Sequence, residues 1–343
     1  MIAQDLTAMG WTPDFAAQIA EDEAELRPAR LASVHRRTVE AITPKGRYEL
    51  VLPPSLPMGN LAVGDWVLAD DLRVHRVLNR HSLLHRFAAG SGVARQLIAA
   101  NIDTLLIVTS CNADFNEARL ERYLVLAGAA GIIPVIVLTK ADTADPAEYI
   151  HRAKGLQRGL DVVALNARGP DVADRLTNWL QPGKTLALLG SSGVGKSTIA
   201  NALGAPIQDT GDIREDDAKG RHTTTARHLL PLPGQAWLID TPGVRELQLT
   251  DMAGGIEVLY ADLIEIGGAC RFRNCTHDHE PGCAVQAAAA AGQIDPARLI
   301  RWRKLVAEDA TNSTALERAA TRAAGKHTKK SATKQRPQGK PQR

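Results

Sequence analysis

The chain has 343 residues and is 44% hydrophobic, so it can bury the cores of two or three domains. Only 4% of the residues are aromatic, so the cores must consist mainly of small aliphatic side chains, and the net charge of +3 says little about partners. No apolar run reaches the roughly 18 residues that span a bilayer, and residues 1–5 do not resemble a signal peptide. We therefore expect a cytoplasmic protein with no membrane partner.

The first hundred residues predict a helical arm followed by a small barrel. An amphipathic helical pattern covers residues 14–26, so we expect a helical arm over 1–30. Short β-like runs then alternate with turn signals over 31–98, which indicates an antiparallel barrel of the OB-fold or SH3-like type. Residues 75–95 carry several Arg and His residues and no acid, which fits either a face for RNA or a solvated loop.

An alternation of strands and helices over residues 99–252 predicts an α/β domain. Its continuous apolar strands cover 103–109, 132–138, 162–165, 185–189 and 236–239. Such strands, separated by helices, form a parallel sheet with both faces covered, and ligands bind at the carboxyl ends of its strands.

The rest of the chain predicts a mostly helical domain over 253–322, interrupted by a Cys/His cluster. A basic, disordered tail is expected over 323–343. No Asp or Glu occurs from Arg318 onwards, which suits either an acidic polymer such as RNA or a solvated end that binds nothing.

A glycine-rich stretch that follows the strand at 185–189 fits the phosphate-loop pattern G-x-x-x-x-G-K-[ST]. Glycines let successive backbone N–H groups point at phosphate oxygens, Lys196 would reach the β- and γ-phosphates, and Ser197 would bind Mg²⁺. The alternative is an ordinary strand–turn–helix. The residues expected around the phosphates are Gly190, Ser191, Ser192, Gly193, Val194, Gly195, Lys196, Ser197 and Thr198.

A second phosphate-side motif, D-T-P-G, follows the strand at 236–239. Asp240 would hold Mg²⁺ through water, and the Gly243 N–H would sense the γ-phosphate. A D-x-x-G motif alone is weak, because loops often contain it. Its position after a strand and downstream of a phosphate loop makes it more specific.

The segment Thr139-Lys140-Ala141-Asp142 predicts guanine recognition. The Asp142 carboxylate can accept from guanine N1–H and the 2-amino group, which adenine lacks, so GTP is selected over ATP. Lys140 would pack its stem along the base, and Ala167, next to Asn166, would meet the base edge through its N–H. A lone T-K-x-D is more often a surface turn, but its coupling to the phosphate loop favours the guanine interpretation.

The order of these motifs is reversed relative to an ordinary GTPase, because the base reader precedes the phosphate loop. This order indicates circular permutation, in which the old termini are joined and a new break falls in a surface connection. The Asp240 turn then leads within tens of residues into the Cys/His cluster.

The Cys/His cluster predicts a metal site. Cys270, Cys275, His277 and Cys283 have the spacing C-x₄-C-x-H-x₅-C, and three thiolates with one imidazole form a closed, structural, tetrahedral Zn²⁺ site. His279 is a competing ligand. The remaining cysteine, Cys111, is expected to be a small buried residue.

Several of these motifs together resemble one family. They are G-R-H-T-T-T at 220–225, D-T-P-G-V-R-E-L at 240–247, C-R-F-R-N-C-T-H at 270–277 and E-P-G-C-A-V at 280–285. They resemble the ribosome small-subunit-dependent GTPase A family (RsgA, also called YjeQ) over about residues 10–310. Asn166 departs from the family, which often has Ser there.

The resemblance implies an N-terminal OB-fold, a permuted GTPase domain and a C-terminal zinc domain. It also implies a monomeric GTP phosphohydrolase that binds GTP or GDP with Mg²⁺. Its partners would be the 30S subunit and 16S rRNA, and it would act in late 30S maturation with ribosome-stimulated turnover.

The segment at 219–225 lies where a switch I must be, and one hydroxyl of Thr223, Thr224 or Thr225 is expected to reach Mg²⁺. Val244 stands where many GTPases have a water-orienting Gln, so intrinsic hydrolysis should be slow. His222 is the candidate that positions or deprotonates the water, although it could instead contact RNA or solvent. We assign catalysis to Lys196, His222 and Thr224, and Thr225 to nucleotide binding.

Two other functions remain open at this stage. A P-loop kinase or ATPase would share the phosphate loop but not the guanine selectivity. A non-catalytic RNA-binding zinc/OB module would carry a vestigial nucleotide site, which the intact Lys196, Ser197 and Asp142 argue against.

Overall fold

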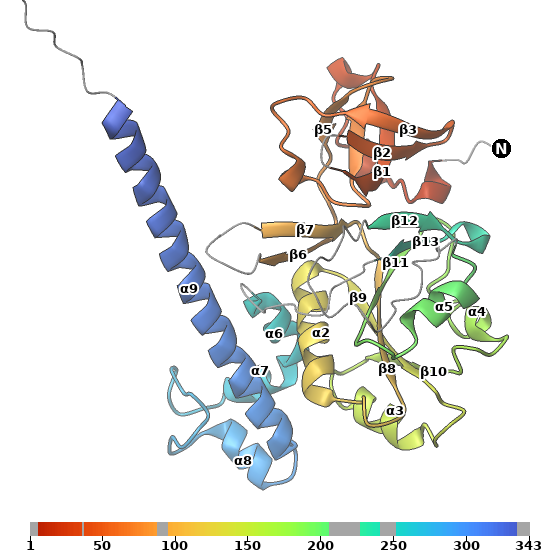
Figure 1. The fold of residues 1–343 in the computed structure, drawn as a ribbon. Helices are drawn as coiled ribbons and strands as arrows, with labels where there is room; N and C mark the ends of the chain where they lie inside the picture. Colours follow the sequence, from red (N-terminus) through yellow and green to blue (C-terminus); the bar gives the residue numbers. More distant parts are fainter. Residues whose placement is uncertain (1–5, 36–37, 88–94, 206–226, 241–251, 335–343) are drawn as a thin grey trace, which may run out of the picture.

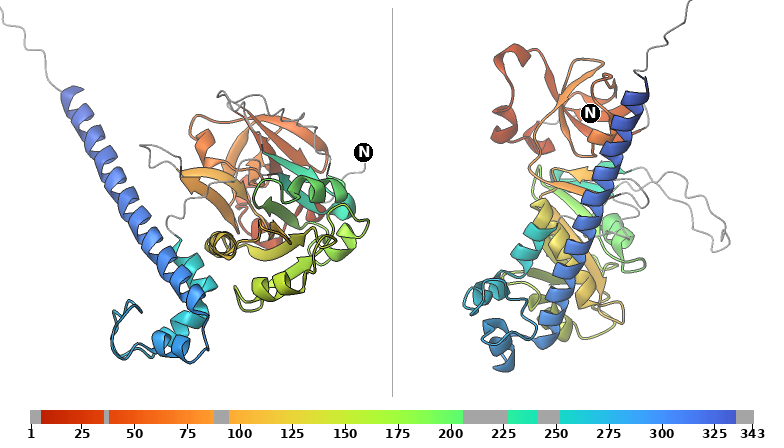
Figure 2. Two further views of the ribbon diagram at one scale, coloured as in Figure 1. Left: turned by 60° about the horizontal axis from the view of Figure 1, so that its bottom comes forward. Right: turned by 90° about the vertical axis from the view of Figure 1, so that its left-hand side faces the viewer.

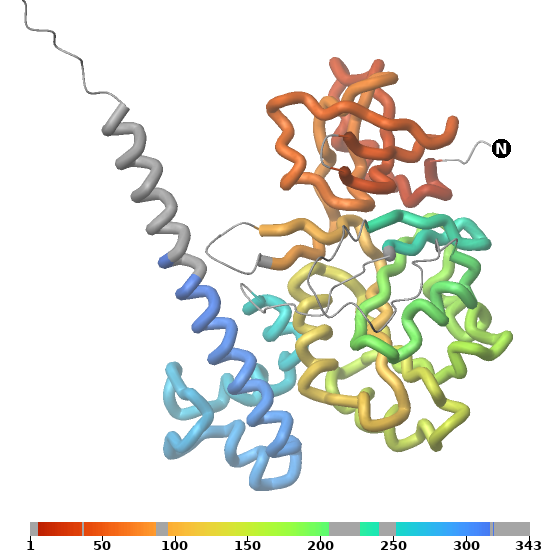
Figure 3. Tube along the Cα trace, in the orientation of Figure 1, coloured from red at the N-terminus to blue at the C-terminus, as the bar shows by residue number. Residues whose placement is uncertain are grey.

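A computed structural model describes residues 6–35, 38–87, 95–205, 227–240 and 252–334. The chain forms an N-terminal β-barrel, a central α/β sheet and a C-terminal helical module (Figure 1). Figure 3 follows this order along the trace, from the barrel in red and orange to the helical module in blue.

The N-terminal segment differs from the expected helical arm. It contains only the short turns η1 (Thr7–Met9), α1 (Pro13–Ala16) and η2 (Glu21–Glu23), and the first strand begins at Arg27. The physical reason is tertiary packing: Trp11 stacks on Phe15 at 5.5 Å between ring centroids and meets the edge of Trp66 at 4.8 Å. The apolar residues thus pack against the barrel as separate turns.

Five antiparallel strands form the barrel in the order β3-β2-β1-β4-β5. They are β1 (Arg27–Val34), β2 (Thr38–Thr43), β3 (Gly46–Val51), β4 (Trp66–Ala69) and β5 (Val74–Val77). A parallel bridge between Val51 and Arg73 brings the two edge strands together. The result is a closed five-stranded barrel of the OB type, one of the two types expected.

Three basic residues at the start of the segment at 75–95 are held in ion pairs. Arg76 bonds Glu23 (2.5 Å), Arg80 bonds Asp65 (2.6 Å) and His75 bonds Asp70 (2.9 Å). The segment continues into a hairpin of β6 (Leu83–Phe87) and β7 (Arg95–Ala100). These three basic side chains therefore serve the barrel's own structure.

A buried arginine joins the barrel to the central sheet. Arg30 is 1% exposed and donates to the Met9 carbonyl (2.6 Å) and to Thr185 Oγ1 (2.7 Å). Burial lowers the pKa of Arg30 to about 10. Because Thr185 is the first residue of a central strand, the two units meet through a polar contact that is shielded from water.

The central sheet has six strands in the order β10-β9-β8-β11-β13-β12. The parallel strands are β8 (Thr104–Ser110), β9 (Ile133–Thr139), β10 (Asp161–Ala164), β11 (Thr185–Leu189) and β13 (Trp237–Asp240). They confirm the parallel sheet predicted from the apolar runs. The antiparallel edge strand β12 (His228–Pro231) was not predicted, since four residues ending in proline carry little strand signal.

Helices cover both faces of this sheet. Leu105 and Ile107 of β8 pack in one hydrophobic cluster with α2 (Glu117–Ala130) and α3 (Ala147–Lys154). The alternate residues of β8 pack in a second cluster with α4 (Val172–Arg175) and α5 (Lys196–Ala202).

The C-terminal module contains α6 (Ala253–Leu259), α7 (Ala261–Gly267), α8 (Ala284–Ala290) and α9 (Pro296–Lys334). It lies beside α2 and away from α4 and α5 (Figures 1 and 2). Residues 323–334 continue α9, so the expected disordered tail is helical at its start. No helix in the described ranges is long and apolar enough to cross a bilayer.

Candidate nucleotide site and metal centre

The carboxyl ends of four parallel strands meet at one edge of the central sheet. Ser110 of β8 is in register with Thr139 of β9, and Ile107 with Leu189 of β11. Every segment that follows these strands therefore begins at the same edge. Three of them, after β9, β10 and β11, carry the predicted base reader, base-edge contact and phosphate loop.

The phosphate loop follows β11 and ends in α5. Gly190 approaches β8 so closely that an added Cβ would lie 2.2 Å from the Val108 carbonyl oxygen. Lys196, the first residue of α5, curls back so that Nζ donates to the carbonyls of Gly190 (2.9 Å) and Ser191 (2.5 Å). The loop thus wraps around its lysine at the start of a helix, the arrangement that presents backbone N–H groups to phosphates.

The predicted base-reading segment at 139–142 contacts the phosphate loop directly. Thr139 is 1% exposed, and its hydroxyl is 2.6 Å from the Val194 carbonyl and 3.1 Å from the Thr109 carbonyl. A Cβ added to Gly195 would lie 3.4 Å from Thr139 Cγ2 and 3.7 Å from Ala167 Cβ. The structure therefore brings together the three segments at 139–142, 166–167 and 190–197.

The rest of the base reader forms a tight turn. Lys140 has φ of 58°, a left-handed conformation that is uncommon for a residue other than glycine. The Thr143 hydroxyl donates to the Lys140 carbonyl (2.9 Å), and Lys140 Nζ lies 4.0 Å from Asp114. Asp142 is exposed at this turn. Its carboxylate is thus open to a ligand.

The base-edge segment forms a second turn beside it. Asn166 Oδ1 accepts from the Arg168 backbone N–H (2.9 Å), so this side chain stabilises its own turn. Ala167 is buried against the phosphate loop, as the contact with Gly195 shows. Ser192, Gly193 and Ser197 are exposed in the phosphate loop and at the start of α5, and Thr198 is half-buried.

Sequence reasoning missed the segment after β8. Ser110 donates to Asn112 Oδ1 (2.8 Å), and Asp114 faces Lys140. Arg119, in the first turn of α2, donates to Ser191 Oγ of the phosphate loop. The available signal was the alternation of polar residues at 110, 112, 114 and 116 between a predicted strand and a predicted helix.

Several predicted site residues lie outside the described residues. These are His222, Thr223, Thr224, Thr225, Gly243 and Val244. Asp240 is the last residue of β13, and Ile239 before it is in register with Ala187 of β11. The Asp240 backbone therefore reaches the same edge of the sheet as the phosphate loop.

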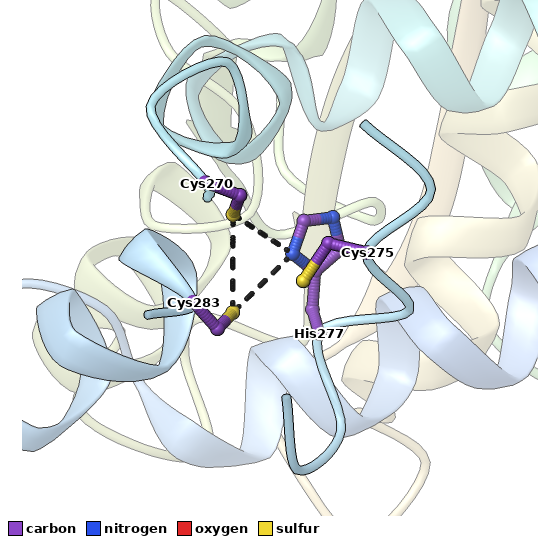
Figure 4. Close-up of side chains that lie close together, drawn as sticks. All are labelled: Cys270, Cys275, His277 and Cys283. Atoms are coloured by element: carbon purple, nitrogen blue, oxygen red, sulfur yellow. Dashed lines mark hydrogen bonds between the residues drawn. The ribbon is translucent and has the colours of Figure 1, made fainter. Parts of the chain in front are cut away.

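The Cys/His cluster forms a compact group in the C-terminal module (Figure 4). The ligand atoms of Cys270, Cys275, His277 and Cys283 all lie within 4.8 Å of one another. His277 Nδ1 is 3.5 Å from the sulfurs of Cys270 and Cys283, which are 3.9 Å apart. A tetrahedral zinc with ordinary bond lengths separates sulfur from nitrogen by about 3.5 Å and two sulfurs by about 3.8 Å. The donor set therefore fits zinc in type and spacing.

Neighbouring residues hold the His277 ring in place. The ring stacks on Trp302 with centroids 5.2 Å apart, and Gln286 Nε2 donates to the His277 carbonyl (2.8 Å). Burial lowers the pKa of His277, which favours the neutral imidazole that a metal requires. His279, the competing ligand, has an 85% exposed side chain and is not in the group. Cys111 is buried, as predicted.

The sheet order and the joined motif segments define a P-loop GTPase whose motifs are circularly permuted. The model of the RsgA GTPase family matches residues 77–250. This chain belongs to the RsgA GTPase family, whose members are GTP-hydrolysing enzymes. The model of the ABC transporter family also matches, over residues 174–335, a stretch that contains the phosphate loop shared by different P-loop NTPases.

Whole-chain comparisons agree with this membership. The chain is 53% identical to the small ribosomal subunit biogenesis GTPase RsgA of Mesorhizobium japonicum, over 90% of this chain and 91% of that protein. It is 46% identical to RsgA 2 of Vibrio vulnificus, over 90% and 89% of the two chains. The crystal structure of YjeQ from Thermotoga maritima matches with a TM-score of 0.62 at 25% identity, covering 82% of this chain and 98% of that one. The fold of YloQ, a circularly permuted GTPase, matches with a TM-score of 0.59 at 24% identity, covering 84% and 96%.

Proposed function

We propose that this protein is a GTPase that binds the small (30S) ribosomal subunit and acts in its late maturation, with turnover stimulated by that subunit. The Thr139–Val194 contact carries the nucleotide part of the proposal, because it unites the base reader with the phosphate loop. The relatives named as small-subunit biogenesis GTPases support the ribosomal part.

Within the nucleotide site, we assign guanine recognition to Asp142 and Lys140, with the Ala167 N–H at the base edge. Backbone N–H groups of residues 190–197 and the Lys196 ammonium would bind the phosphates. Ser197, Asp240 and one switch I threonine would hold Mg²⁺, which neutralises charge on the β- and γ-phosphates. His222 would position the attacking water in the ribosome-bound state.

In the C-terminal module, we propose one structural zinc ion bound by Cys270, Cys275, His277 and Cys283. A site with four protein ligands leaves no open position for a substrate, so its role is to fold the loops between α7 and α8. Gln286 and Trp302 would hold the histidine ligand in its binding orientation.

The remaining assignments follow from the proposed ribosomal role. The protein would contact 16S rRNA, act in the cytoplasm as a monomer and bind no membrane. We propose a division into a barrel, the permuted GTPase domain over 99–252 and the helical zinc domain that begins at 253.

The decisive measurement is the rate of GTP hydrolysis with and without purified 30S subunits. We expect slow turnover alone and at least a tenfold increase with 30S subunits, because the bound particle would place the switch residues for catalysis. Lys196→Ala should abolish both rates and controls for contaminating GTPases. Equal rates with and without 30S subunits would reject the ribosomal proposal while leaving GTP hydrolysis itself intact.

A further inference from the structure

Arg119 lies in the first turn of α2, at the end of that helix that faces the phosphate loop. The Asn116 side chain caps the helix by accepting from the Arg119 backbone N–H (2.9 Å). A cation is unfavourable at this position, because the first N–H groups of a helix already carry positive partial charge. A favourable contact outside the helix must therefore compensate for placing Arg119 there.

That contact is made with the phosphate loop. Nη1 of the half-buried Arg119 donates to Ser191 Oγ, while Lys196 Nζ donates to the carbonyl oxygen of the same serine (2.5 Å). Ser191 is thus held by two cations, one through its side chain and one through its backbone. Its position relative to α2 depends on the first of these bonds.

The positive charge of Arg119 has no carboxylate partner within the described ranges. Neighbouring arginines do have partners: Arg122 pairs with Glu308, and Arg301 pairs with Glu121. An uncompensated guanidinium beside a phosphate-binding loop attracts anions, and the attraction increases with the charge of the anion. GTP carries more negative charge than GDP, so this arrangement favours the triphosphate.

The opposite side of α2 is fixed to the C-terminal module. The fully buried Glu121 carboxylate accepts from Arg301 Nε (2.7 Å). The backbone of α6 also touches α2, since a Cβ added to Gly255 would lie 1.9 Å from the Val125 carbonyl oxygen. Arg119 therefore projects from a firmly held helix, which is what precise positioning of a loop requires.

From these contacts we propose that Arg119 is a positioning residue for GTP hydrolysis. It holds the phosphate loop through the Ser191 hydroxyl, and its charge raises the preference for GTP over GDP. The proposal extends the GTPase activity and does not depend on the ribosomal role, because every contact lies within this chain.

The test uses the full-length protein and measures kcat and KM for GTP without ribosomes. It also measures Kd for GDP and for a non-hydrolysable GTP analogue. Arg119→Ala should lower kcat about tenfold through misplacement of the loop. It should also weaken binding of the GTP analogue more than binding of GDP. Ser191→Ala should lower kcat similarly but keep the nucleotide preference, because the charge remains.

Two further variants separate positioning from a general loss of structure. The double variant should be no slower than Arg119→Ala alone, because both substitutions remove the same bond. Arg119→Lys should restore the preference for the triphosphate but only part of kcat, since lysine keeps the charge without the planar fork. Arg158→Ala, at an exposed arginine in the loop after α3, is the matched control and should behave as wild type.

The proposal is overturned if folded Arg119→Ala keeps both its kcat and its triphosphate preference. It is equally overturned if the two single losses add fully in the double variant. Should Arg119→Ala fail to fold, Ser191→Ala and Arg119→Lys decide the question, and unchanged kcat in both rejects the positioning role.

Discussion

The Thr139 hydroxyl lies 2.6 Å from the carbonyl oxygen of Val194, although 55 positions separate the two residues along the chain. This bond ties the turn at 139–142, which we propose reads guanine, to the phosphate loop. What the site needs is adjacency of β8, β9 and β11 in the sheet, and circular permutation leaves that adjacency unchanged.

Thr139→Val should remove the hydrogen bond between the two segments while almost preserving the shape of the side chain. The Val194 carbonyl would lose its buried donor, at a cost of about 1–3 kcal/mol. We expect a lower free energy of unfolding and weaker GTP binding, measured by denaturant titration and calorimetry. Thr143→Val removes an exposed hydroxyl from the same turn and should change both quantities little. Wild-type GTP affinity in Thr139→Val would contradict this role.

Asp142→Asn should change the base that the site accepts. A carboxylate accepts from the N1–H and 2-amino groups of guanine, whereas an amide can donate to the 2-oxo group of xanthine. We expect GTP affinity to fall at least a hundredfold and XTP to bind more tightly than GTP. Asp174→Asn, at an exposed carboxylate of the same domain, is the control. Unchanged discrimination between GTP and XTP would remove Asp142 from the base site.

Zinc removal should destabilise the C-terminal module. Elemental analysis of the purified protein should show about one zinc per chain, and Cys283→Ser should lose it because only three ligands remain. The thermal unfolding transition of that module should fall, while GTP binding persists. Cys111→Ala lies outside the metal group and should keep its zinc. A zinc-free wild-type protein with an unchanged transition would refute the assignment.

The Glu23–Arg76 pair predicts a pH dependence for the N-terminal segment. The hydrogen bond from Arg76 lowers the pKa of Glu23 from 4.5 to about 2. A carboxyl group with a lowered pKa stabilises the folded state fully above its unfolded pKa, and this stabilisation is lost as the pH falls towards 2. Glu23→Gln should therefore have a lower free energy of unfolding than wild type at pH 7. Plotted against pH, the free energies of unfolding of the two proteins should converge near pH 2. A constant difference across this range would exclude the ionisation as the cause.

Removal of one partner from the buried Arg301–Glu121 pair, which joins α9 to α2, should lower the free energy of unfolding strongly. Glu121 is fully buried, so Arg301→Met would leave its carboxyl group without its guanidinium donor. We expect a loss of about 3–5 kcal/mol in the free energy of unfolding. The matched control is Arg303→Met, because Arg303 lies on the same helix and pairs with the partly exposed Asp278. Similar losses for both variants would show that burial of Glu121 does not matter.

Local patterns were sufficient for the parallel strands and the phosphate loop, since both depend on residues close together in sequence. The prediction of one helix for the N-terminal arm was wrong, because the periodicity at 14–26 does not reveal that Trp11 and Phe15 pack on Trp66. The contact of Arg119 with Ser191 was also missed. The two residues are 72 positions apart and the contact belongs to no motif, so the sequence of neither segment predicts it.

The amino-acid sequence alone determined the nucleotide chemistry, the reversed motif order and the four candidate metal ligands. These depend on residue type and short spacing, which a linear chain displays directly. The tertiary structure decided which side chains bridge the segments: Thr139 to the phosphate loop, Arg119 to Ser191 and Arg30 to Thr185. Such bridges depend on the order in which strands pair, and that order is set by burial of the whole core rather than by any local stretch.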